Sequence, residues 1–174
     1  MPETALICRV PEAERYIAHY RQRFDPSARR NVPAHVTILY PFMAPPLVDA
    51  GVLVTLQGIA DSVPCFSYRM AETRRFPVAL YLAPDPGIPF ATLTDRVHHA
   101  FPDYPPFDGK FDTVVPHVTV AHGDEPLLCE IEVELRIALP GAGVAARCAE
   151  LVLIENSTGR WEQMHVFPLG ASEV

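Results

Sequence analysis

The sequence lacks the features that mark a membrane-bound or secreted protein. No window reaches the ~18 consecutive apolar residues of a membrane-spanning helix. The first ten residues, MPETALICRV, have neither the basic start nor the long apolar stretch of a signal peptide. No long block of like charges indicates a disordered tail. We therefore expect a globular protein of the cytoplasm with no membrane partner.

Cysteine is scarce, and the usual cofactor motifs are missing. The four cysteines are widely spaced without a CxxC pair, which predicts reduced thiols rather than a zinc site or a disulfide framework. The phosphate-binding pattern GxxxxGK[ST] is absent, and Gly141-Ala142-Gly143 has no strand–glycine–helix context. We expect no metal and no other cofactor.

Charged residues make up only 20% of the chain, and acidic residues outnumber basic ones to give a net charge of −7. Such a protein is poorly suited to coat duplex DNA or RNA, because that binding depends on neutralising phosphates. A small phosphate ester in a locally basic cleft remains compatible with it. The runs Arg29-Arg30 and Arg74-Arg75 either supply such a patch or are solvated surface.

What the sequence has is ample apolar residues and many prolines. At 174 residues and 49% apolar content, the chain can bury the core of one domain (residues 1–174) made of two lobes. Nineteen prolines favour a loop-rich α+β protein over a helical bundle.

One short phrase occurs twice, about half of the chain apart. His35-Val36-Thr37 lies in VPAHVTILYP, and His117-Val118-Thr119 lies in VVPHVTVAHG. Each copy follows a proline closely and continues into apolar, β-favouring residues. The repetition predicts a duplicated unit with one copy of the phrase in each half.

The elements expected around the two copies follow the same order. In the first half we expect a strand at 5–10, a helix at 11–24, a loop at 27–33, a strand at 35–40, a helix at 47–60 and a strand at 65–75. In the second half we expect a strand at 78–82, a turn at 84–89, a helix at 90–100, a loop at 101–109 and a strand at 117–121. Residues 126–139 fit both helical and strand periodicity, and the repeat favours a helix. A hairpin at 149–155 and 161–169 closes the chain.

This order predicts an α+β fold with a pseudo-two-fold duplication. We expect two antiparallel sheets that face a central cleft, with the helices outside. Residues two apart on a strand share a face, so His35 and Thr37 should point one way, as should His117 and Thr119. A two-fold arrangement would then bring two imidazoles and two hydroxyls to one pocket. Such a set suits acid–base cleavage of a phosphate ester.

Other residues near the motifs have less specific signals. Tyr40 and Phe42 could stack on a base or pack in the core. The loop aromatics could line the mouth of the cleft: Tyr104, Phe107 and Phe111. Regular alternation puts His122, five residues after His117, on the opposite face, which disfavours a metal site shared by these two histidines.

The two phrases resemble the paired signature motifs of the two-histidine (2H) phosphoesterase superfamily. Within it, the chain most resembles the 2′-5′ RNA ligase-like, or RNA 2′,3′-cyclic phosphodiesterase, group. That group carries His-x-Thr/Ser-x twice with apolar x residues, which matches HVTI at 35–38 and HVTV at 117–120. The order of elements is similar to the bilobal fold of the family along essentially the whole chain.

The resemblance implies that His35 and His117 are the acid–base pair and that Thr37 and Thr119 contact the phosphate. It implies a metal-independent reaction that hydrolyses, or transesterifies, the 2′,3′-cyclic phosphate end of RNA or of a nucleotide. The acidic net charge favours small nucleotides or short RNA ends as partners, and we expect a monomer. Which histidine is the acid stays open. Two alternatives also stay open: a nucleotide-binding module with little or no catalysis, and a two-histidine metal hydrolase.

Overall fold

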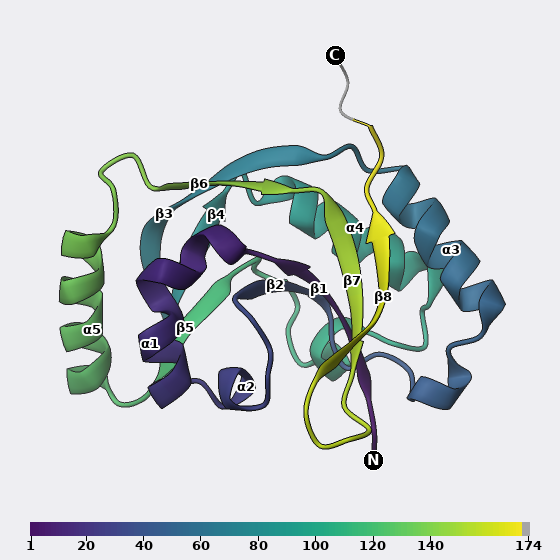
Figure 1. Cartoon of the computed structure of the whole chain (residues 1–174), viewed down its shortest axis with the longest axis horizontal. Coiled ribbons are helices and arrows are strands. Elements are labelled where there is room, and N and C mark those ends of the chain that lie inside the picture. The colour runs from purple at the N-terminus through teal and green to yellow at the C-terminus, as the bar shows by residue number, and fades with distance from the viewer. Residues whose placement is uncertain (172–174) are drawn as a thin grey trace.

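The computed structural model describes residues 1–171, so residues 172–174 of the expected domain lie outside it. Its strands form two four-stranded antiparallel sheets (Figure 1). The first sheet has the order β2-β1-β7-β8, and the second has the order β5-β4-β3-β6. The strands of the first sheet are β1 (Thr4–Arg9), β2 (His35–Leu39), β7 (Glu150–Glu155) and β8 (Glu162–Pro168). Those of the second are β3 (Phe66–Phe76), β4 (Ala79–Asp85), β5 (Val118–His122) and β6 (Val144–Cys148).

The helices cover the outer faces of the two sheets. They are α1 (Glu14–Phe24), α2 (Pro26–Arg29), α3 (Ala50–Asp61), α4 (Ile88–Ala100) and α5 (Glu125–Ala138), with short 3-10 turns η1 (Pro11–Ala13), η2 (Pro45–Leu47) and η3 (Pro106–Gly109). Helices α1 and α5 lie together at one end of the molecule, and α3 and α4 lie together at the other (Figure 1). The predicted α+β class with outside helices is confirmed.

The two lobes interlock because two of the connecting helices, α1 and α4, each pack against the other sheet. Helix α1 joins β1 to β2 of the first sheet but packs against β5 of the second. Helix α4 joins β4 to β5 of the second sheet but packs against β2 of the first. One apolar cluster accordingly contains core residues from both sheets. Each motif strand is therefore covered by a helix from the other half of the duplication.

The pairing register repeats the duplication in detail. On β2 the pairing with β1 jumps from Thr37 to Leu39, and on β5 the pairing with β4 jumps from Thr119 to Ala121. Each motif strand thus carries one extra residue directly after its threonine, as at a β-bulge. The same irregularity at the same place in both halves is the structural mark of the repeat.

Local capping explains two boundaries that the sequence analysis placed wrongly. The expected loop at 27–33 begins inside the one-turn helix α2, because Pro26 suits a first helical position and the Asp25 side chain accepts from the Ser27 N–H. The helix expected from residue 47 begins at Ala50, because the Asp49 side chain caps it by accepting from the Val52 N–H.

Two strand predictions were also wrong. Strand β6 was missed altogether, since its five residues alternate only briefly between buried and exposed and follow directly on a glycine turn. Strand β4, expected to stop at Leu82, continues through Pro84 to Asp85. The helix over the ambiguous segment 126–139 is confirmed as α5, and so is the hairpin of β7 and β8.

We expect the contact between α4 and β2 to contribute measurably to stability. The buried Thr94 hydroxyl donates to the Ile38 carbonyl at 2.8 Å. The change Thr94→Val keeps the shape and leaves this carbonyl unpaired, which should cost about 1–3 kcal/mol in the free energy of unfolding. Urea denaturation measures this. The control Thr92→Val removes a hydroxyl that bonds within its own helix, to the Ile88 carbonyl at 3.0 Å. Equal losses in the two variants would contradict the assignment.

Candidate active site

The two motifs present the same pattern of burial on their strands. His35 and Thr37 are half-buried, whereas Val36, Ile38 and Leu39 are buried. Residues 117–121 repeat this order without change. Residues 35–37 and 117–119 alternate as predicted. The imidazole and the hydroxyl of each motif therefore share one face of their sheet, which we call the motif face, and the valine between them packs in the core.

The two motif strands lie against each other across the boundary between the sheets. Contacts join β2 and β5 directly. Positive charge on His117 has a small effect in the same region, since it lowers the pKa of His35. The structure thus brings the strands that carry the two motifs together.

Each imidazole is held by the backbone in the same way. The His35 Nδ1 lies 2.7 Å from the Pro33 carbonyl oxygen, and the His117 Nδ1 lies 2.6 Å from the Val115 carbonyl oxygen. A carbonyl can only accept, so Nδ1 carries the proton and donates in both rings. The lone pair of the neutral ring is therefore on Nε2, and a contact two residues upstream orients both rings.

Burial weakens the basicity of both rings. It is the main reason why the pKa of His35 falls from 6.5 to about 4, and it also lowers the pKa of His117. The carbonyl contacts of Nδ1 act in the other direction and raise both values. Charge on Arg21 lowers the pKa of His35 further. Both imidazoles are consequently neutral at pH 7 in the free protein.

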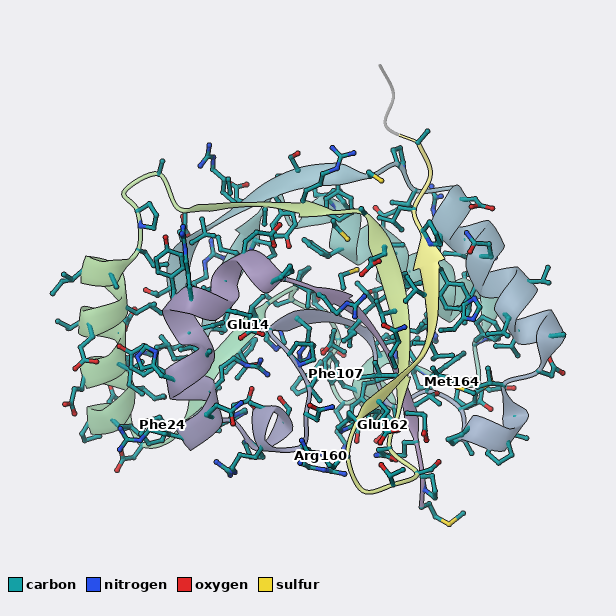
Figure 2. The ribbon with its side chains drawn as sticks, viewed as in Figure 1. Glu14, Phe24, Phe107, Arg160, Glu162 and Met164 are labelled. Atoms are coloured by element: carbon teal, nitrogen blue, oxygen red, sulfur yellow. The ribbon has the colours of Figure 1, made fainter. Side chains whose placement is uncertain are left out.

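Aromatic residues surround the second imidazole. The His117 ring meets Phe76 and Tyr81 edge-on, with centroid distances of 5.1 and 5.4 Å. A pocket of about 450 Å³ opens beside it, with Phe107 and Phe111 in its wall. Figure 2 shows Phe107 near the centre of the molecule. The expectation that these two loop aromatics border the site is supported, and Phe76 and Tyr81 are neighbours that the motifs did not reveal.

The predicted orientation of His122 was wrong. Regular alternation put it on the face opposite His117, yet both imidazoles line the same pocket. The register shift between Thr119 and Ala121 reverses the alternation beyond it and turns His122 back to the motif face. Charge on His122 lowers the pKa of His117. Hydrophobic alternation alone carries no signal for such a shift.

The aromatic residues after the first motif divide between the site and the core. The Tyr40 hydroxyl donates to Glu3 Oε2 at 2.8 Å, and its ring meets Trp161 edge-on at 5.9 Å. Both rings belong to a small apolar cluster with Ile7, the partner of Thr37 in the pairing of β1 and β2. Tyr40 therefore lies on the motif face of the first sheet. Phe42 packs in the core instead, and the expected loop residue Tyr104 packs on it.

Of the two basic runs, only one residue is placed on the motif face of a sheet. Arg74 pairs with Tyr81, itself the partner of Thr119, and forms an exposed ion pair with Glu72 at 2.8 Å. Arg75 points to the other face and binds Glu132 of α5 at 2.6 Å. On the first sheet, Arg9 pairs with His35 and is bound by Glu150. Carboxylates thus balance each of these cations.

The part of the chain that the structure describes contains no cluster of side chains suited to bind a metal ion. Among residues 1–171, no group of three or more His, Cys, Asp or Glu side chains is arranged to hold a metal ion. Within the same range, no helix is long and apolar enough to cross a membrane.

Comparison with known proteins places the chain in a family. A sequence model of the 2'-5' RNA ligase superfamily matches residues 10–160. The chain belongs to this superfamily, which is part of the two-histidine phosphoesterases. A search of curated proteins found no match.

Solved structures share the fold at low sequence identity. Escherichia coli LigT, crystallised with 3'-AMP, is 17% identical with a TM-score of 0.64, over 97% of this chain and 99% of its own. TT0787 of Thermus thermophilus is 15% identical with a TM-score of 0.64, over 98% of this chain and 100% of its own. These similarities confirm the bilobal fold along nearly the whole chain.

We expect both motif histidines to titrate below 6.5, with His35 near pH 4. The unfolded chain, with ordinary histidines near 6.5, then binds more protons than the folded chain between these values. Stability should be full above about pH 6.5 and fall as the pH drops towards 4. NMR titration of the ring protons, with urea denaturation at several pH values, checks this. His35→Asn should reduce the loss, and a His35 titrating at or above 6.5 would contradict the prediction.

Proposed function

We propose that this protein is a metal-independent phosphoesterase that hydrolyses 2′,3′-cyclic phosphate ends of RNA or of nucleotides. His35 and His117 are its acid–base pair, and Thr37 and Thr119 bind the phosphate. Family membership supports a phosphoesterase or ligase activity. The observation that carries the finer proposal is the matched pair of Nδ1–carbonyl contacts, which leave Nε2 of both rings for proton transfer.

The proposed reaction needs one neutral and one protonated imidazole. The neutral ring takes a proton from water through Nε2, and the water oxygen attacks phosphorus. The bond from phosphorus to one ribose oxygen breaks, and the protonated ring gives its Nε2 proton to that oxygen. The product is a phosphomonoester with a free hydroxyl. An RNA 5′-hydroxyl in place of water gives the related transesterification.

The lowered pKa values agree with this division of roles once substrate is present. The free site at pH 7 holds two neutral rings, either of which can act as the base. A bound phosphate diester is negatively charged, and a negative charge nearby favours the protonated form of an imidazole. Binding of the substrate therefore helps to supply the proton that the acid needs.

The two motif threonines supply hydrogen-bond donors for the phosphate. Thr37 and Thr119 are half-buried on the motif face, and within residues 1–171 neither hydroxyl is engaged in a hydrogen bond. Both can donate to the non-bridging phosphate oxygens, on which charge increases in the transition state. Aromatic walls beside His117 and near Tyr40 suit a nucleoside on either side of the phosphate.

The solved relatives support a nucleotide as ligand. Escherichia coli LigT has been crystallised with 3'-AMP and with NADP+. We propose that the corresponding cleft of this chain takes a small nucleotide or a short RNA end. The acidic balance of the whole chain and the carboxylates beside Arg9 and Arg74 weigh against a long RNA.

We expect turnover of 2′,3′-cyclic mononucleotides, and of an oligonucleotide with a cyclic phosphate end, in the presence of EDTA. Either His35→Ala or His117→Ala should lower kcat by about 10²- to 10⁴-fold, because each variant removes one proton-transfer group. Chromatographic identification of the phosphomonoester product measures the rate and the regiochemistry.

The matched control is His99→Ala, which removes an exposed histidine from α4 and should leave kcat unchanged. Near-normal turnover by either motif variant contradicts the paired acid–base proposal. Tight binding with no product over hours indicates the nucleotide-binding alternative. Activity that EDTA abolishes and a divalent metal restores indicates a metal hydrolase.

A further inference from the structure

The largest fully buried side chain in the described part of the protein is a cation that belongs to neither motif. Arg21 lies on α1 with only 2% of its side chain exposed. Its guanidinium donates to Asp25 Oδ2, to the Ser27 hydroxyl at 3.2 Å and to the Val32 carbonyl at 3.1 Å. A buried charge is retained only when it is paired and hydrogen-bonded, and these partners meet that need.

The partner carboxylate fixes the start of the same segment. Asp25 is also buried, and its Oδ2 lies 3.0 Å from Arg21 Nη2. Its other oxygen, Oδ1, accepts from the Ser27 N–H at 2.9 Å and from the Ser27 hydroxyl at 2.8 Å. The Arg21–Asp25 pair therefore holds both the beginning and the end of the segment from α2 to β2.

A second carboxylate of α1 fixes the peptide just before His35. Glu14 Oε1 accepts from the Ala34 N–H at 2.6 Å and lies 4.0 Å from Arg21 Nη1. Figure 2 shows Glu14 on the side of α1 that faces the strands. Arg21 holds the Val32 carbonyl, Glu14 holds the Ala34 N–H, and Pro33 lies between them. The peptide groups on both sides of Pro33 are thus fixed by α1.

The Pro33 carbonyl oxygen accepts the hydrogen bond from His35 Nδ1, and these two atoms lie 2.7 Å apart. The direction of that carbonyl decides where the His35 ring points and which nitrogen carries the proton. The helix that fixes it also packs against β5, the strand that follows His117. Helix α1 therefore fixes the position of His35 relative to the second motif.

The second half has no equivalent arrangement in its described residues. The segment before His117 holds one ion pair, between Lys110 and Asp108 at 3.5 Å, and both side chains are exposed. Exposed pairs of this kind contribute little to the rigidity of a loop. The duplication is thus symmetric in its strands and asymmetric in what holds its two histidines.

We propose that Arg21 is a positioning residue for His35, which acts through the Val32 and Pro33 carbonyls and not by contact with substrate. Its loss should release the 25–34 segment and allow the imidazole to turn away from the direction that catalysis needs. Helix α1 and the second motif should remain in place. The kinetic consequence rests on the proposed function, whereas the orientation of the ring can be measured without any activity.

The test compares Arg21→Met with Arg23→Met, an exposed arginine on the same helix. The first readout is the NMR signal of each Nδ1 proton, assigned with His35→Ala and His117→Ala. We expect two protected Nδ1–H signals in the unchanged protein and in Arg23→Met. In Arg21→Met the His35 signal should be lost to exchange with water, while the His117 signal is kept.

The second readout is steady-state kinetics with a 2′,3′-cyclic mononucleotide, corrected for the folded fraction. Arg21→Met should lower kcat by up to about 100-fold with KM changed far less, since a small misplacement of a catalytic group has effects of that size. Arg21→Lys keeps the charge and should recover part of kcat. If Arg21→Met does not fold, the NMR test is made with Glu14→Ala, because the Glu14 side chain is more exposed. It removes the acceptor of the Ala34 N–H and should weaken the same NMR signal.

A His35 Nδ1 signal that is as strong as in Arg23→Met overturns the inference, whether in the folded Arg21 variant or, when that variant is needed, in Glu14→Ala. So does a kcat per folded molecule equal to that of Arg23→Met. If the NMR result is as expected but the unchanged protein hydrolyses no cyclic phosphate, the proposed function fails and the positioning role of Arg21 stands.

Discussion

The two-residue alternation of a β-strand is the constraint on which the rest of this structure depends. It puts an imidazole and a hydroxyl on one face and a buried valine on the other, once within β2 and once where His117 leads into β5. The valine anchors the strand in the common core, so the polar pair cannot slip by one residue without exposing that core. Duplication of this unit then supplies two polar pairs to the boundary between the sheets.

The crossed helices hold two such units together at one boundary. Helix α1 packs on β5 and helix α4 packs on β2. Neither sheet can therefore shift without displacing the helix that packs on the other sheet. The core is correspondingly continuous across both lobes. The rigidity needed to hold the two proposed catalytic groups in register thus comes from packing, and the backbone carbonyls before each histidine add the final orientation.

Much of this arrangement could be predicted from residues alone. The fold class, the helix over 126–139 and the faces of the two motifs follow from periodicity and repetition, because these properties are local. The place of His122 could not be predicted, since one extra residue after Thr119 reverses the alternation without changing the composition of the strand. The place of Arg21 could not be predicted either. An arginine on an amphipathic helix is expected to face water, and its burial depends on Asp25 and a segment that folds back on it.

The central claim is that both imidazoles act on one phosphorus atom. Its most direct test is a crystal structure with the 2′- or 3′-phosphomonoester product, or with a slowly cleaved cyclic phosphorothioate. We predict that Nε2 of His35 and Nε2 of His117 each lie about 2.6–3.2 Å from oxygens of the same phosphate. A phosphate bound by only one of the two rings, or bound elsewhere on the molecule, would contradict the account.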